Sequence, residues 1–120
     1  MAKHNETGCK GEGIAVDYFR QKGYKILYKN WRKGRHEIDI IADFSNTIHF
    51  VEVKTRTFSK YLPPEYAVNK KKLKGMMMAA AVFMEAHTYP KKAIQFDVLA
   101  ITLKPSVEIR LIEDVYFYNY

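Results

Sequence analysis

A chain of 120 residues with 48% hydrophobic and 28% charged residues has the size and composition of one folded domain, residues 1–120, without room for a second core. Twenty lysine and arginine residues against thirteen aspartate and glutamate residues leave a formal charge of +7, which favours a polyanionic partner such as a nucleic acid. The single cysteine, Cys9, excludes an internal disulfide and a cysteine-rich zinc site. Because the sequence also lacks a secretory signal and an apolar run long enough to span a bilayer, we expect a cytoplasmic protein without a membrane partner.

Helical and strand patterns alternate along the chain, and turn residues separate them. In chain order we predict a helix over residues 6–22, strands over 24–31, 36–43 and 47–55, a helix over about 69–87, and strands over 93–103 and 107–118. A basic turn over residues 32–35 follows the first strand. This order, α-β-β-β-α-β-β, predicts an α/β fold with a mixed central sheet of about five strands flanked by helices.

The hairpin in the middle of the chain carries the most informative residues. A tight turn centred on residues 45–46 pairs positions whose numbers sum to 91. Asp39 then lies opposite Glu52, and Glu37 lies opposite Lys54. Because side chains alternate along a strand, these four residues are predicted to share one face, and a slip of one residue would separate them.

Two carboxylates that face each other across a ladder repel, and apolar surroundings make their uncompensated charge more costly. A divalent cation, Mg²⁺ or Mn²⁺, between Asp39 and Glu52 would turn this penalty into a binding site. Lys54 could then orient an attacking water or offset the charge that develops on a phosphate. The alternative is a salt-bridged face, in which Glu37 and Asp39 pair with Lys54 and Arg56.

A third carboxylate heads the apolar stripe of the first predicted helix. Glu12 precedes Ala15, Val16 and Phe19 at helical spacing, so its side chain is expected on the helix face that meets the sheet. It is therefore a further candidate for the metal site. The alternative is an acidic residue that stabilises the first turns of a helix through the helix dipole.

Basic residues gather at the start of the second predicted helix and beside the predicted hairpin. Lysines at a helix start oppose the helix dipole, which suggests contact with a phosphate backbone, although a solvated charged face is the alternative. The candidate nucleic-acid-binding residues are Arg32, Arg56, Lys70, Lys71 and Lys72. The same helix is rich in methionine and alanine, which predicts a buried helix, with a helix-mediated homodimer as the alternative.

Two runs of residues match a known motif. The run HEIDII at residues 36–41 and the run FVEVKTR at residues 50–56 resemble the PD-(D/E)xK nuclease superfamily and, more narrowly, the YraN-like family of bacterial proteins. Further matches are Gly11-Glu12 with Ala15, Gly23-Tyr24, Asn30 with Arg32, Lys72, and Phe96-Asp97-Val98. The resemblance implies a restriction-endonuclease-like core, related to that of archaeal Holliday-junction resolvases.

By motif, the resemblance implies that Asp39 and Glu52 are metal ligands and that Lys54 is the catalytic lysine. It implies that Glu12 supports the metal site. The sequence departs from the family in having His36 where Gly is usual and Gln95 where Arg is usual.

The function expected from the residues and the resemblance is Mg²⁺- or Mn²⁺-dependent hydrolysis of phosphodiester bonds in DNA, with branched or repair-intermediate DNA as the substrate. The alternative is a catalytically inactive module that keeps the nuclease fold and binds nucleic acid or another protein.

Overall fold

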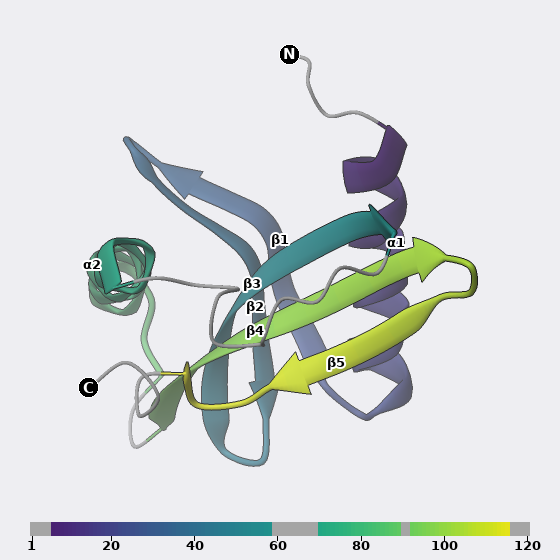
Figure 1. Ribbon diagram of the computed structural model, residues 1–120. Coiled ribbons are helices and arrows are strands. Elements are labelled where there is room, and N and C mark those ends of the chain that lie inside the picture. The colour runs from purple at the N-terminus through teal and green to yellow at the C-terminus, as the bar shows by residue number, and fades with distance from the viewer. Residues whose placement is uncertain (1–5, 59–69, 90–91, 116–120) are drawn as a thin grey trace.

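The computed structural model describes residues 6–58, 70–89 and 92–115, and Figure 1 shows a twisted sheet with one helix on each side. The elements are α1 (Glu6–Gln21), β1 (Lys25–Lys33), β2 (His36–Phe44), β3 (Thr47–Phe58), α2 (Lys70–Ala86), β4 (Ala93–Lys104) and β5 (Glu108–Ile112). The predicted order, α-β-β-β-α-β-β, is confirmed.

The five strands form one mixed sheet in the order β1-β2-β3-β4-β5. Neighbouring strands pair antiparallel except β3 and β4, which pair in parallel. A parallel pair needs a crossover connection, and α2 lies in the connection between these two strands. The β1–β2 hairpin extends beyond the rest of the sheet on the side of α2 (Figure 1). This arrangement confirms the predicted mixed sheet with flanking helices.

Side chains of the central strands divide between two cores, one under each helix. Phe50 of β3 and Val98 of β4 belong to the core that packs against α2. Their neighbours Val51 and Leu99 belong to the core that packs against α1. The period-2 alternation of a strand buried on both faces explains this division. No helix among the described residues is long and apolar enough to cross a membrane.

The structure corrects several predicted boundaries, and β3, predicted to end at residue 55, runs to Phe58. The last strand ends at Ile112, because Asp114 has a φ of 57° and its backbone N–H donates to the Asp97 carboxylate at 2.9 Å instead of continuing the ladder. The part of the prediction beyond residue 115 lies outside the described residues. The basic turn over residues 32–35 is shorter than predicted, since β1 runs to Lys33. Gly34, at a φ of 62°, supplies the left-handed conformation that this tighter turn needs.

Helix α1 approaches β3 closely at Gly11. A Cβ atom added at Gly11 would lie 2.0 Å from Thr55 Oγ1 and 2.8 Å from Thr55 Cβ, so a larger residue would have to move the helix or the strand. Gly13 of the same helix has nothing within 4 Å of such a Cβ. The absence of a side chain at Gly11 therefore lets the following residue, Glu12, come close to the sheet.

We expect Gly11→Ala to lower the free energy of unfolding by about 1–3 kcal/mol, the usual cost of overpacking. Gly13→Ala is the matched control and should raise it by up to about 1 kcal/mol, because alanine is the better helix former and meets no neighbour there. Urea denaturation of the two variants measures the difference. Equal stability of the two variants would contradict the close approach of α1 to β3.

Candidate active site

The register of the β2–β3 hairpin confirms the prediction as far as the ladder runs. The recorded pairs follow the predicted sum of 91 from the turn up to Ile40↔Val51. They end one position before the predicted pair of Asp39 and Glu52. Instead, the Val53 backbone N–H donates to Asp39 Oδ2 at 2.8 Å. The Asp39 carboxylate thus takes the place of a backbone partner at the point where the ladder stops.

The predicted shared face does not hold at Asp39, because β2 breaks its alternation there. Ile38 and Ile41 both pack into the core under α2, although they are three positions apart. Ile40 packs into the core under α1. Asp39 also lines a pocket on the α1 side, so it lies between the two faces of the sheet.

The neighbouring strand β1 has the matching irregularity at Asn30. The pairs Lys29↔Ile40 and Trp31↔Ile38 flank Asn30 and Asp39 on their two strands. Asn30 has a φ of 52°, a left-handed conformation that is uncommon outside glycine and for which asparagine is enriched. Backbone conformations of this kind cluster at functional sites. The two irregular positions therefore face each other beside the candidate metal ligand.

Glu52 lies between two lysines that come from different elements. Its side chain is buried, and its carboxylate oxygens lie 3.6 Å from Lys54 Nζ and 3.5 Å from Lys72 Nζ. Lys54 belongs to the same strand, two positions on, as predicted. Lys72 comes from the first turns of α2. It is one of the predicted nucleic-acid-binding residues, and the structure also places it beside Glu52.

The electrostatics of Asp39 indicate that the two carboxylates interact. Burial, and next the negative charge of Glu52, raise the pKa of Asp39 from 3.8 to about 6. The hydrogen bond from the Val53 N–H and the positive charge of Lys72 oppose the rise but do not cancel it. A carboxyl group perturbed by burial and by a second carboxylate is typical of functional sites.

Glu12 lies beside this centre and is held by Asn30. The Asn30 Nδ2 atom donates to Glu12 Oε1 at 3.3 Å. Glu12, Asn30 and Asp39 line one pocket of about 300 Å³ between α1 and the sheet. Over residues 6–58, 70–89 and 92–115, however, no three His, Cys, Asp or Glu side chains are close enough together to hold a metal ion as a group.

Asn30 is the residue of this site whose role the sequence reasoning missed. In the sequence, Asn30 stands out only as one of the residues that match the family. Asparagine is depleted in strands and tolerates left-handed backbone, so its place within a predicted strand was the available signal.

The remaining predicted residues lie on the surface around the centre. Glu37 forms its ion pair with Arg32 across β1 and β2, at 3.7 Å, and the recorded β2–β3 ladder ends before its predicted pair with Lys54. The alternative salt-bridged face, with Glu37 and Asp39 paired to Lys54 and Arg56, is therefore not the arrangement that forms. Arg56, Lys70 and Lys71 are exposed, as are Arg32 and Lys72.

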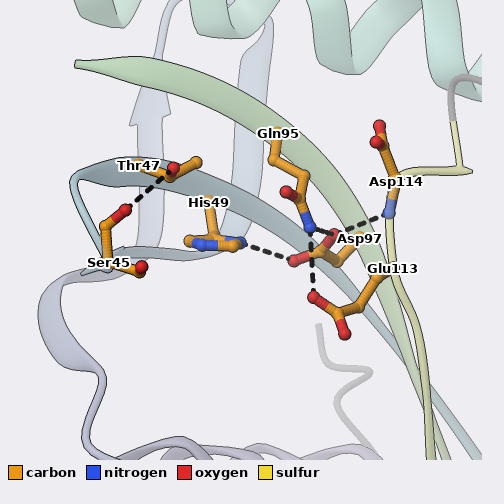
Figure 2. A network of polar contacts seen from close by, with 7 residues as sticks. All are labelled: Ser45, Thr47, His49, Gln95, Asp97, Glu113 and Asp114. Atoms are coloured by element: carbon orange, nitrogen blue, oxygen red, sulfur yellow. Dashed lines mark hydrogen bonds and ion pairs between the residues drawn. The ribbon is translucent and has the colours of Figure 1, made fainter. Parts of the chain in front are cut away.

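A second polar cluster, shown in Figure 2, lies on the α1 side of the sheet, where His49 contacts Tyr24. Asp97 is completely buried, and its carboxylate accepts hydrogen bonds from His49 Nδ1 at 2.8 Å, Gln95 Nε2 at 2.9 Å and the Asp114 backbone N–H at 2.9 Å. Burial, and next the charge of Asp97, raise the pKa of Tyr24 to about 12. His49 and Asp97 are both buried, as is usual for a pair that stabilises the fold.

The donor set at Asp39 and Glu52 fits the divalent cation that the resemblance implies. Mg²⁺ and Mn²⁺ prefer oxygen ligands, and Mg²⁺ is commonly bound by one or two carboxylates together with water and substrate phosphate oxygens. Asp39 and Glu52 provide two carboxylates whose mutual repulsion a cation would relieve. Lys54 and Lys72 compensate the charge of Glu52 when no cation is bound.

Comparison with known proteins identifies the family. The chain belongs to the Uncharacterised protein family UPF0102, whose family model matches residues 11–101, and this confirms the YraN-like resemblance. Similar proteins include UPF0102 proteins of Bacteroides thetaiotaomicron (41% identical, covering 84% of this chain and 83% of the relative) and Christiangramia forsetii (39% identical, 98% and 99%). A UPF0102 protein of Geobacter metallireducens is 41% identical over 90% of this chain and 92% of its own length.

Proposed function

We propose that this protein is a metal-dependent nuclease that hydrolyses phosphodiester bonds in DNA, with branched or repair-intermediate DNA as its substrate class. The observation that supports it best is the centre at the end of the β2–β3 ladder. There, two interacting carboxylates, Asp39 and Glu52, lie beside two lysines, Lys54 and Lys72. Acidic and basic groups held together at a half-buried site match the needs of phosphodiester hydrolysis, which are an activated water and positive charge on the phosphate.

Each residue of the centre has a role that follows from its contacts. Asp39 and Glu52 would hold Mg²⁺ or Mn²⁺, and the cation would lower the pKa of a bound water and neutralise phosphate charge. The Val53 N–H fixes the orientation of the Asp39 carboxylate. Lys54 and Lys72 are placed to donate to phosphate oxygens once Glu52 has another partner. Asn30 orients Glu12 toward the pocket that it shares with Asp39.

The direct test is cleavage of labelled DNA substrates, including blunt duplex, forked and four-way-junction DNA, with Mg²⁺ or Mn²⁺ and with an EDTA control. We expect metal-dependent cleavage that Glu52→Gln and Lys54→Ala abolish. Glu113→Gln, which changes a carboxylate that contacts Gln95 and not the centre, is the matched control and should cleave like the wild type. Cleavage that survives EDTA, or wild-type cleavage by both Glu52→Gln and Lys54→Ala, would contradict the proposal.

One observation favours the inactive alternative, a nucleic-acid-binding or protein-interaction module. Glu52 is already charge-compensated by Lys54 and Lys72, so this carboxylate has positive partners without a cation. Metal titration separates the alternatives, because a stable ion-pair cluster binds no cation.

A cytoplasmic location and a possible homodimer belong to the same proposal, the first because the chain has one cysteine and so needs no oxidising compartment.

Lys72→Ala should weaken DNA binding and flatten the dependence of log affinity on log salt by about one unit. The reason is that a protein with one phosphate contact fewer releases about one counterion fewer when it binds. Lys74→Ala is the matched control, since Lys74 is an exposed lysine of the same helix outside the centre. Fluorescence anisotropy over a salt series measures both slopes. Equal slopes for the two variants would remove Lys72 from the interface.

A further inference from the structure

A groove of about 760 Å³ runs between the tip of the β1–β2 hairpin and the first turns of α2. Arg35, His36 and Glu37 line it from the hairpin. Figure 1 shows the hairpin and the helix on the same side of the molecule. Lys72 lines the groove and also contacts Glu52, so the groove leads to the proposed catalytic centre.

One end of the groove is cationic. Lys71 and Lys72 line this end, and Arg35 lines the groove from the hairpin, together with Glu37, whose charge is paired with Arg32 at 3.7 Å. Lys71 and Lys72 stand in the first turn of α2, which contains no acidic residue, and Lys72 also pairs with Glu52 at 3.5 Å. This concentration of positive charge favours an anion such as a backbone phosphate.

The other end of the groove is apolar and open. Gly75, Met76 and Met78 line it one to two helical turns after the lysines. Met78 is 53% exposed, and a Cβ added at Gly75 would meet nothing within 4 Å. A glycine in the interior of a helix costs about 1 kcal/mol relative to alanine, so its presence here suggests a use for the space it leaves. Flexible, polarisable methionine side chains suit contact with a flat aromatic surface.

A groove that is cationic at one end and apolar at the other matches a nucleotide whose base is unpaired. In a duplex the bases are paired and stacked, so a duplex would present only sugars and phosphates to Gly75 and Met78. A single strand can place its phosphate at Lys71 and its base over the apolar end. The length of helix from Lys71 to Met78, about 10 Å at 1.5 Å per residue, accommodates a short stretch of strand.

We propose that this groove binds an unpaired nucleic-acid strand and leads it to the centre at Asp39 and Glu52. The second part rests on the proposed nuclease function, whereas the binding itself does not. The substrate class would then be single-stranded DNA or the unpaired arm of a fork or flap.

The test is binding of a short fluorescent oligo(dT) and of a blunt duplex of equal length to the full chain in EDTA, where metal-dependent cleavage is absent. We expect oligo(dT) to bind at least about fivefold more tightly than the duplex at equal salt. Gly75→Leu fills the groove and should weaken oligo(dT) binding about tenfold. Its melting temperature should not fall, because leucine is a better helix former than glycine and the site has open space.

Two controls separate the groove from general effects. Gly75→Ala improves the helix in the same way but leaves most of the groove open, so it should bind oligo(dT) like the wild type. Arg35→Ala and Lys71→Ala should each reduce the salt slope for oligo(dT) by about 0.7, while Lys74→Ala should leave it unchanged.

Wild-type affinity in Gly75→Leu, or equal affinity for duplex and single strand, would overturn the groove proposal even if the protein cleaves DNA. Selective oligo(dT) binding that Gly75→Leu removes would support the groove even if no metal-dependent cleavage is found, and in that case only the proposed function fails.

Discussion

Asp39→Asn is expected to raise the melting temperature of the metal-free protein at pH 7 while abolishing metal-dependent cleavage. Asparagine keeps the carbonyl oxygen that accepts the Val53 N–H, so the local backbone geometry is preserved. It removes a charge that is disfavoured by burial and by Glu52. At about 1.4 kcal/mol per pKa unit, and with allowance for the partial exposure of Asp39, the stabilisation should be about 1–3 kcal/mol.

The pH dependence has a defined sign. Because the pKa of Asp39 is higher in the folded protein (about 6) than its ordinary value of 3.8, the folded state binds more protons than the unfolded state between these values. The wild type therefore loses this part of its stability as the pH rises from about 4 to about 6. The stability difference between Asp39→Asn and the wild type should be small at pH 4 and reach its full size near pH 7.

Thermal melts of both proteins, with EDTA and with millimolar Mn²⁺, measure these effects. Mn²⁺ at ten times its dissociation constant should stabilise the wild type by about 1.4 kcal/mol and the variant much less. Glu108→Gln is the matched control, because Glu108 is an exposed carboxylate on the edge strand β5, outside the centre. A destabilised Asp39→Asn together with a metal-indifferent wild type would leave no physical basis for the metal site.

Asp97→Ala is expected to lower the free energy of unfolding by about 3–5 kcal/mol, a large part of the total stability of a small domain. The alanine variant leaves three donors without their acceptor: His49 Nδ1, Gln95 Nε2 and the Asp114 backbone N–H. Since Asp97 is completely buried, water cannot easily replace the carboxylate. The network also ties the residues after β5 to β3 and β4, so its loss affects three elements (Figure 2).

Asp97→Asn separates hydrogen bonding from charge in the same network. Gln95 and Asp114 both donate to Asp97 Oδ1, which asparagine can reproduce. The asparagine amide would then face His49 Nδ1, which can accept if the imidazole changes tautomer. We therefore expect a cost of only about 1 kcal/mol. Urea denaturation of both variants measures the two costs. Equal losses in the two variants would mean that the negative charge of Asp97, and not its hydrogen bonds, holds the cluster together.

The hairpin shows which features a sequence can predict. The turn residues Ser45 and Asn46 adopt φ values of 53° and 61°, as a tight two-residue turn requires. Together with period-2 alternation, this turn sets the register that the recorded pairs confirm up to Ile40↔Val51. Both signals are local, so they survive without knowledge of the rest of the fold.

The same reasoning fails at Asp39, where neighbours from other elements decide the geometry. Alternation predicts Asp39 on one face, but the left-handed Asn30 on β1 and the Val53 N–H on β3 turn its carboxylate between the strands. The competition between a backbone ladder and a side-chain acceptor depends on which groups meet in space. The spacing of residues along the chain does not show whether the Val53 N–H donates to a backbone carbonyl or to the Asp39 carboxylate.

The sequence by itself determined the order of elements, the hairpin register and the choice of Asp39, Glu52 and Lys54 as the candidate centre, because spacing and turn chemistry act over a few residues. The tertiary structure alone decided that Lys72 reaches Glu52 across the β3–α2 connection and that Asp97 is buried beside His49. Parallel pairing of β3 with β4 and packing of α2 bring these groups together from distant positions. Such contacts depend on how whole elements pack, which side-chain spacing within one element does not specify.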